Sequence, residues 1–343
     1  SVAAMFLAQE LSDGALFSVK MGQQEAMSRS SDPEELLSLF DEIGEMKKPD
    51  EVDRFIRKLP SFYDHSQESV RAGAFDATAV MALRMNFSVR LLVQAGELLD
   101  QRWEPGIVDW LRGDVAPRLR KLYDAGVSPR PAIVRAMAWI QAHDSAPFFS
   151  ALVRSPGTPD AEFTEAAVGL GNLSSLEGAE LLAAAVGKRQ GRSRLTLFWA
   201  LRRIGQSVQP DPGDPEQEKR LLTLLEQVVA QFQDLDDAAL CAAVHAVWTY
   251  QHAGVTTALT ELFESARGEL VCPRVEIQPP FGPPVALVQE EQLRWLLLNV
   301  LADVGVGNPE FKGWVSRMIS TGHFDDKTDK GLRQLYGALA GQE

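Results

Sequence analysis

The stretch between Ser31 and Leu270 is a succession of amphipathic helical segments, and this pattern constrains the fold more than any other feature. The segments are about 10–16 residues long and are joined by short Gly, Pro or Asp turns. No run in this stretch has the strict alternation of a strand. Segments of this kind bury one apolar stripe each and must pack on one another. The sequence therefore predicts an all-α protein, and the regular succession over about 300 residues favours a solenoid over a bundle.

The clearest repeat lies between Asp160 and Gln206, where two segments that end in glycine enclose a third. When such terminal glycines are placed in one column, four segments align as EAAVGLG, WALRRIG, WTYQHAG and NVLADVG. They end at Gly171, Gly205, Gly254 and Gly305. The intervals between these glycines are 34, 49 and 51 residues, so the repeat accommodates inserted loops.

This irregular helical repeat resembles the HEAT-like, armadillo-type α-solenoid family, over the range from about Glu68 to Leu339. The resemblance implies a right-handed α-α superhelix. It also implies that the column six positions before each terminal glycine faces a concave groove. Trp139, in the sequence AIVRAMAWIQAHD, occupies a similar place. The column itself holds Glu165, Trp199, Trp248 and Asn299.

Two regions depart from the helical pattern. Residues 1–30 are expected to be an N-terminal extension or docking arm, which leaves 31–343 as the HEAT-like α-solenoid. The chain begins at Ser1 rather than Met, which is consistent with a targeting segment that was either removed or left out of this sequence. The stretch 268–289, GELVCPRVEIQPPFGPPVALVQ, contains five prolines and cannot be a helix. It predicts an extended or hairpin insertion, which either has a function or folds back over a helix pair.

The net charge of the chain limits the classes of partner that it is expected to bind. The formal net charge is −13 and the pI is about 5.0, which argues against nucleic acid as the main partner because phosphate binding relies on clustered Lys and Arg. A local basic cluster in one turn has a simpler interpretation as a solvated connection between helices. The basic cluster consists of Lys188, Arg189, Arg192 and Arg194.

No apolar run approaches the roughly 18–20 residues of a membrane span.

The two cysteines, Cys241 and Cys272, lie far apart and form no CxxC or metal-binding spacing. This suggests either a reducing compartment or indifference to redox state, and we expect a cytoplasmic protein. Cys241 and His245 are one turn apart on a predicted helix, and His252 follows further along, so a metal site or a Cys–His pair is geometrically possible. A buried free thiol beside an inter-helix histidine is the commoner arrangement.

Catalytic signatures are missing from the sequence. There is no HExxH, Walker A, GxSxG or GxGxxG motif in a suitable setting, so we predict no catalytic residue, metal or cofactor. The cluster Asp234, Asp236 and Asp237 is expected to cap the helix that follows, where the helix dipole favours acids.

The sequence therefore predicts a non-enzymatic scaffold or adaptor that binds another protein through its concave groove, its proline-rich loop, or both. The identity of the partner and the oligomeric state are left open. Trp and Arg are common anchors of interfaces, whereas the competing interpretation places the tryptophan rings in the core between repeats. The candidate partner-binding residues are Trp139, Trp199, Trp248, Arg203, Phe281, Pro280 and Pro283.

Two further hypotheses remain open. Some proteins that resemble HEAT-repeat solenoids are enzymes of the DNA-glycosylase or chromophore-lyase type, and the aromatic column is compatible with a groove of that kind. The charge of −13 departs from the glycosylase pattern. Alternatively, the chain is one module of a larger assembly, with residues 1–30 as its docking arm.

Overall fold

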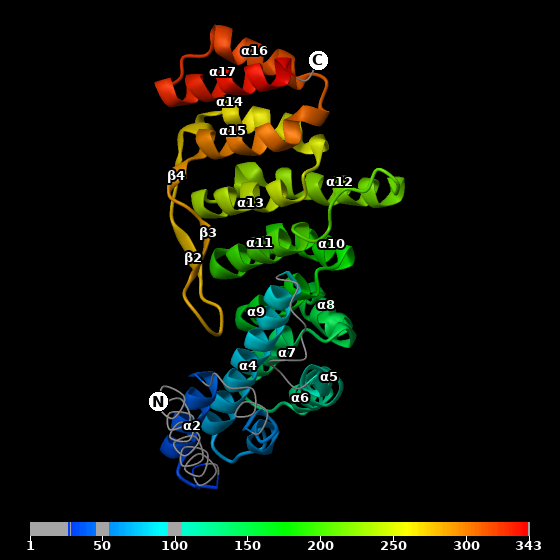
Figure 1. Cartoon of the computed structure of the whole chain (residues 1–343), viewed down its shortest axis with the longest axis vertical. Helices are drawn as coiled ribbons and strands as arrows, with labels where there is room; N and C mark the ends of the chain where they lie inside the picture. The colour runs from blue at the N-terminus through cyan, green and yellow to red at the C-terminus, as the bar shows by residue number, and fades with distance from the viewer. Residues whose placement is uncertain (1–26, 28, 46–54, 95–104, 342–343) are drawn as a thin grey trace, which may run out of the picture. The chain divides into compact units, whose positions relative to one another are not determined.

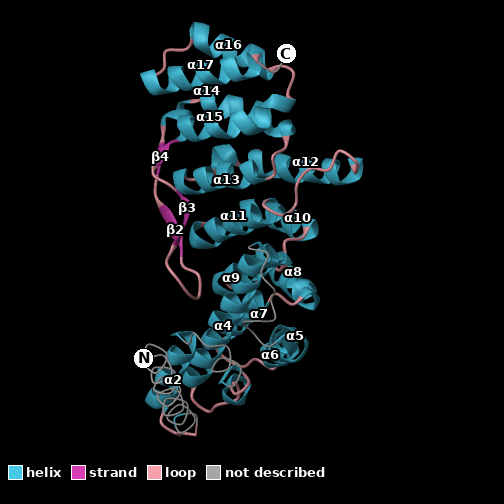
Figure 2. Cartoon of the chain, viewed as in Figure 1, coloured by secondary structure: helices cyan, strands magenta, loops and turns pink. Residues whose placement is uncertain are grey.

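The computed structural model of the chain describes residues 27, 29–45, 55–94 and 105–341. The expected docking arm, residues 1–30, lies almost wholly outside them. The regular elements of the described residues are helices, apart from four short strands between Val271 and Gln292 (Figures 1 and 2), which confirms the predicted all-α class and the position of the insertion. The chain divides into two compact units, Ser1–Ala142 and His143–Glu343, which are described separately below.

The first unit is built around one long helix, α4, which packs against α2 and α7. The sequence predicts two separate helices after Glu104, but a π-helical turn over Leu111–Val115 joins them into one continuous helical stretch. A 3-10 turn over Leu59–Phe62 precedes α4. The helices of this unit are α2 (Pro33–Glu45), α4 (Glu68–Gln94), α5 (Pro105–Trp110), α6 (Ala116–Asp124) and α7 (Arg130–Ile140).

The second unit contains two layers of helices (Figure 1). In the layer that we call layer A, each helix packs on the next in the order α9, α11, α13, α15 and α17. The other layer begins with α8, α10 and α12 packed in sequence, while α14 and α16 lie against α15 and α17. The bounds are α8 (Ala146–Arg154), α9 (Asp160–Leu173), α10 (Leu176–Ala185), α11 (Gly191–Gly205), α12 (Pro215–Val229), α13 (Asp237–Thr249), α14 (Thr256–Glu264), α15 (Leu293–Val304), α16 (Phe311–Thr321) and α17 (Asp326–Ala340).

Glycine sets the spacing of the first three helices of layer A. A Cβ atom added to Gly171 of α9 would lie 2.9 Å from the Cα of Ala200 in α11. A Cβ added to Gly205 of α11 would overlap the Oγ1 atom of Thr249 in α13. Ala200 and Thr249 each stand five positions before the next glycine of the aligned column, so the same contact recurs from helix to helix. Gly254 itself lies beyond the end of α13, in a 3-10 turn.

The insertion forms a hairpin, as one of the two sequence-based alternatives predicts. At its base β1 (Val271–Cys272) pairs with β4 (Glu291–Gln292), and beyond them β2 (Val275–Ile277) pairs with β3 (Val285–Val288). Both pairs are antiparallel, and the register of the second shifts between Val275 and Glu276, which leaves Leu287 of β3 without a partner residue in β2. We call residues 271–292 the strap. Its β1 and β3 strands contact α13, and Figure 2 shows the strap beside layer A.

We expect Gly171→Ala to lower the free energy of unfolding by about 1–3 kcal/mol, because the new Cβ meets the backbone of Ala200 and cannot be accommodated by a side-chain rotation. The matched control is Gly337→Ala in α17, where an added Cβ has no neighbour within 4 Å. That change should raise the free energy of unfolding by roughly 0.5–1 kcal/mol through helix propensity. Urea denaturation followed by circular dichroism measures both, and a stabilising Gly171→Ala would contradict the close helix approach.

Candidate functional site

Three tryptophans on consecutive helices of layer A remain partly exposed. Trp199 lies on α11, Trp248 on α13 and Trp295 on α15. We call this set the indole row. The column six positions before the terminal glycines contains Trp199 and Trp248, but in α15 it contains Asn299. Trp295, one turn earlier in the same helix, is instead the aromatic residue that this helix contributes.

A positively charged or imidazole side chain accompanies each indole of the row. The guanidinium carbon of Arg203 lies 5.5 Å from the ring centre of Trp199. The ammonium of Lys327, from α17, lies 3.2 Å from the ring centre of Trp295. The ring of His245 lies 6.1 Å from that of Trp248. Cations over indole faces are attracted by the ring quadrupole, so Arg203 and Lys327 orient the rings of Trp199 and Trp295.

The indole N–H groups of Trp248 and Trp295 are held by hydrogen bonds within the unit. Trp248 Nε1 donates to Asp303 Oδ2 at 2.6 Å, and Trp295 Nε1 donates to Thr328 Oγ1 at 3.2 Å. A ring that is held at both its edge and its face loses little side-chain entropy when a partner covers it. The row is therefore pre-organised for contact with an apolar or π-rich surface.

Trp139, the third tryptophan predicted from the sequence, belongs to the first unit and does not join the row. Its ring is only 6% exposed. Its carbonyl oxygen accepts a hydrogen bond of 2.9 Å from Asn86 Nδ2, and Asn86 Oδ1 accepts one of 2.9 Å from Arg112 Nη2. Trp139 thus fits the competing interpretation, in which the ring packs in a core, and we leave it out of the candidate site.

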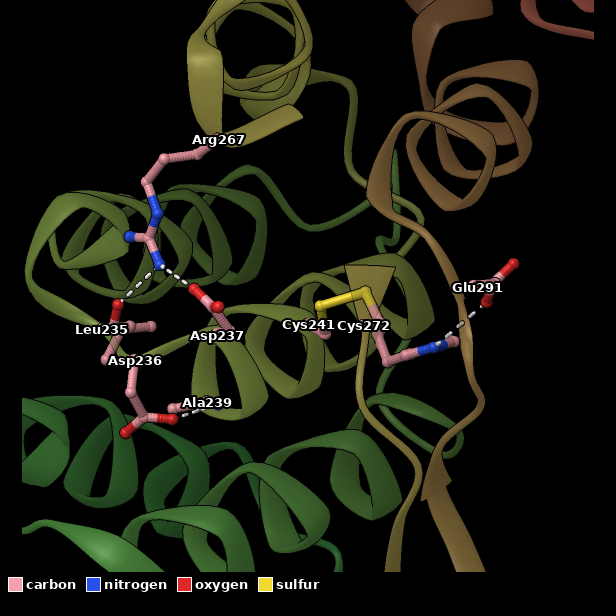
Figure 3. Close-up of a disulfide and its surroundings, with 9 residues drawn as sticks. Leu235, Asp236, Asp237, Ala239, Cys241, Arg267, Cys272 and Glu291 are labelled. Atoms are coloured by element: carbon pink, nitrogen blue, oxygen red, sulfur yellow. Dashed lines mark hydrogen bonds and ion pairs between the residues drawn. A yellow bond between two sulfur atoms is a disulfide. The ribbon is translucent and has the colours of Figure 1, made fainter. Parts of the chain in front are cut away.

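A disulfide joins Cys241 of α13 to Cys272 of β1 (Figure 3). Both residues are fully buried. The expectation of a buried free thiol beside His245 is therefore wrong, and the sulfur of Cys241 is not available to a metal ion. The strap makes this bond possible because it folds back across 31 residues of sequence to lie on α13.

The base of the strap is attached to the beginning of α13 by a second contact, which Figure 3 also shows. Arg267 Nη2, just before the strap, donates to the carbonyl oxygen of Leu235 at 2.7 Å and to Asp237 Oδ1 at 3.3 Å. Asp236 accepts a hydrogen bond of 3.0 Å from the backbone N–H of Ala239. The acidic cluster therefore contains the predicted helix cap, and its neighbour Asp237 also binds Arg267.

A polar cluster lies between the strap and the helices. Arg202 Nη1 of α11 donates to the carbonyl oxygen of Leu287 in β3 at 3.2 Å. His245 Nε2 is buried, has no hydrogen-bond partner among the described residues, and lies 3.9 Å from Glu291 Oε1 of β4. Burial, together with the smaller effect of nearby Arg202, lowers the pKa of His245 to about 4. Burial also raises the pKa of Glu291, while Lys327 acts in the opposite direction.

The tip of the strap is turned and held by its own residues. Gly282 adopts a φ of 91°, a conformation that other residues rarely reach. Gln278 Nε2 donates to the carbonyl oxygens of Pro279 and Gly282 at 3.1 and 3.0 Å. These bonds help to close the loop between β2 and β3, where Pro279 accepts through its carbonyl oxygen but the prolines have no N–H to donate.

The strap presents apolar side chains to solvent. Phe281 is 37% exposed; of the other two predicted tip residues, Pro283 is exposed and Pro280 is partly exposed. Five large apolar side chains are classed as exposed in the described part of the chain, and three belong to the strap. The three are Val271, Phe281 and Val285.

The structure adds residues that the sequence-based prediction missed. His245 is three positions before Trp248, so helical spacing alone could have placed them on one face. Arg203, four positions after Trp199, follows the same spacing and was predicted. Lys327 reaches Trp295 from another helix, and no local signal in the sequence indicates that contact.

Comparisons with known proteins identify no family. No protein-family profile and no curated protein matches the chain. Among solved structures, it is similar to an engineered protein of the Northeast Structural Genomics Consortium, with 16% identity, a TM-score of 0.45, and coverage of 93% of this chain and 88% of the other. A second engineered protein of that consortium has 15% identity, a TM-score of 0.39 and coverage of 84% and 97%. Within the described residues, no helix has the length and apolar character required to cross a membrane.

We expect His245 to make the protein less stable as the pH falls from about 6.5 to about 4. Its pKa in the folded chain, about 4, lies below the ordinary value of 6.5, so the unfolded chain binds the proton first. The stability present at pH 7 is then lost by up to about 1.4 kcal/mol per pH unit.

His245→Gln should remove this part of the pH dependence. Urea midpoints are measured between pH 7 and pH 4 for the native chain and for His245→Gln. The comparison separates the contribution of His245 from that of the carboxyl groups that titrate in the same range, Glu291 included. The exposed His323 provides the control, and His323→Gln should leave the pH dependence of the urea midpoint as it is in the native chain. Parallel pH curves for the native chain and His245→Gln would contradict the prediction.

Proposed function

We propose that the chain is a non-enzymatic protein-binding scaffold of the HEAT-like, armadillo-type α-solenoid kind, with the right-handed α-α superhelix of that class. It holds another protein on the indole row and on the tip of the strap. The observation that carries the proposal is the indole row itself. Trp199, Trp248 and Trp295 come from three consecutive helices, stay partly exposed, and each have a cationic or imidazole neighbour.

The layered packing of the second unit supports the solenoid class. Within layer A, each helix packs on the one before and the one after it, as in proteins built from stacked repeats. The recurring contact of Gly171 with Ala200 and of Gly205 with Thr249 repeats from helix to helix. Stacks of this kind provide extended surfaces for partners, which suits an adaptor.

The chemistry of the surface favours a protein partner. Aromatic rings and arginine are enriched among the residues that dominate protein interfaces. Rigid rings lose little entropy on binding, and those of Trp248 and Trp295 are already oriented by Asp303 and Thr328. Phe281, at a loop closed by Gln278, adds an apolar anchor on a second element.

The disulfide indicates the type of compartment in which the proposed scaffold works. Bonds such as Cys241–Cys272 form and persist mainly in oxidising compartments, whereas the sequence predicted a cytoplasmic protein. We therefore place the folded, disulfide-bonded form outside the reducing cytosol. A free-thiol assay on protein isolated without a reductant tests this directly, because the bonded form has no cysteine left to label.

Photo-crosslinking in the source cells tests the binding surface. A benzophenone amino acid replaces Trp199 in one variant and Phe281 in another, and an exposed residue of α12, Glu226, in the control. We expect the first two to crosslink to the same protein and the control to crosslink to none. Crosslinks to that protein from position 226 alone would place the binding surface elsewhere.

Once a partner is identified, Trp199→Ala should weaken its binding by about 2 kcal/mol or more, which is roughly 30-fold in Kd. Tyr336→Ala is the matched control, since Tyr336 is an exposed aromatic residue on α17 that belongs to neither surface. Isothermal calorimetry measures both. Unchanged affinity after Trp199→Ala combined with deletion of residues 279–284 would refute the proposed surface.

A further inference from the structure

The strap is attached at its base by contacts that do not depend on the disulfide. Arg267 binds the start of α13, as described above. On the other side, Arg294 Nε donates to the carbonyl oxygen of Phe263 at 3.1 Å, and its Nη1 donates to Glu269 at 3.2 Å. The backbone N–H of Leu293 donates to the carbonyl oxygen of Leu270 at 3.0 Å. These bonds fix the two points at which the strap leaves and rejoins the helices.

Beyond its base, the strap is held to the helices by few contacts. Leu287 and Val288 of β3 are buried, and Arg202 donates to the Leu287 carbonyl. The approach of His245 to Glu291 is 3.9 Å, and the neutral imidazole makes no ion pair at pH 7. The rest of the strap, from Val275 to Val285, is partly or fully exposed. The bond from Cys272 to Cys241 is therefore the covalent link between the strap and α13, and it acts beside the burial of Leu287 and Val288.

We infer that the Cys241–Cys272 disulfide is a redox-sensitive clasp that controls partner binding. In the oxidised chain it holds the strap on α13, so that the strap tip and the indole row are presented together. Reduction releases β1 and the rest of the strap from α13, while the bonds of Arg267, Arg294 and Leu293 keep the two ends of the strap attached, and the composite surface is lost. This inference rests on the proposed function, because it concerns regulation of the same binding surface.

The chemistry is a thiol–disulfide exchange with a dithiol, either a protein dithiol of the oxidoreductase class or dithiothreitol. One thiolate of the reductant attacks a cystine sulfur, which breaks the S–S bond, forms a mixed disulfide and leaves a thiolate on the other cysteine. The second thiol of the reductant then displaces the remaining cysteine. Two electrons and two protons pass to Cys241 and Cys272, and the reductant becomes a disulfide.

Burial couples this exchange to movement of the strap. Cys241 and Cys272 are both fully buried, whereas Val271 and Pro273, on either side of Cys272, are exposed. A reductant therefore reaches the sulfur atoms only when β1 lifts from α13. Local opening of this kind belongs to segments with few buried contacts, and the strap is such a segment. Once the bond is broken, nothing covalent restores the closed position.

Hydrogen exchange of the full chain tests the release of the strap without a partner. We compare the oxidised protein, the protein reduced with dithiothreitol, and a Cys241→Ser, Cys272→Ser variant. Amides of residues 275–288 should exchange about tenfold faster or more in the reduced protein and in the variant. Amides of α9 and α17 should be unchanged, and dithiothreitol should have no effect on the variant.

Two results would overturn the clasp. Equal protection of residues 275–288 in the oxidised and reduced chains would show that the disulfide does not hold the strap. Faster exchange throughout α9 to α17, with loss of helical circular dichroism, would show that the bond supports the whole unit instead of the strap alone.

The crosslinking variants separate this inference from the proposed function. With the benzophenone at position 281 or 199, the crosslink to the partner should fall at least several-fold on reduction. A crosslink of equal yield in both redox states refutes the regulation and leaves the scaffold function intact. If neither state yields a crosslink, the scaffold function fails, and the exchange rates of residues 275–288 alone decide whether the clasp exists.

Discussion

The close approach of α9, α11 and α13 is the packing constraint on which the candidate site depends. Ala200 and Thr249 are the residues that meet Gly171 and Gly205, and each directly follows a tryptophan of the row. Successive residues of a helix are rotated by about 100° around its axis. A residue that points at the neighbouring helix therefore leaves its predecessor pointing well away from that contact. The glycine contacts thus fix both the helix spacing and the exposed position of the indoles.

The disulfide acts at a different level, because it determines the position of the strap and not that of the helices. In the chain-entropy description, a closed loop of about 30 residues contributes about 3–4 kcal/mol. Burial of two aliphatic side chains such as Leu287 and Val288 contributes about 3–6 kcal/mol. The covalent and apolar contributions are therefore comparable in size, and ordering the exposed prolines and valines of the strap opposes both. The strap depends on its clasp to a degree that the layered helices do not.

Much of the fold could be predicted from local sequence. Helical spacing and Pro or Gly punctuation indicate the helices, and the glycine column indicates a packing contact that recurs between neighbours. The extension of this pattern to Trp139 fails, because a local pattern does not show whether the surrounding chain covers a ring. The Cys241–Cys272 bond and the Lys327–Trp295 contact depend on segments that are distant in sequence, so they emerge only once the chain is folded.

Charge in the folded chain narrows the class of partner further. The basic cluster in the turn between α10 and α11 partly binds residues of its own unit. Arg189 Nη1 donates to Asp160 Oδ1 at 2.7 Å and to the Thr158 carbonyl oxygen at 3.1 Å. The guanidinium of Arg189 also lies 4.1 Å from the ring centre of Phe163. Arg194 is buried and donates to the Arg189 carbonyl. Binding to a phosphate backbone requires several cations free to displace counterions. A cluster in which Arg189 and Arg194 already bind the chain itself gives little support to a glycosylase-like groove. It is in keeping with the proposed protein partner, whose surface would cover the aromatic rings.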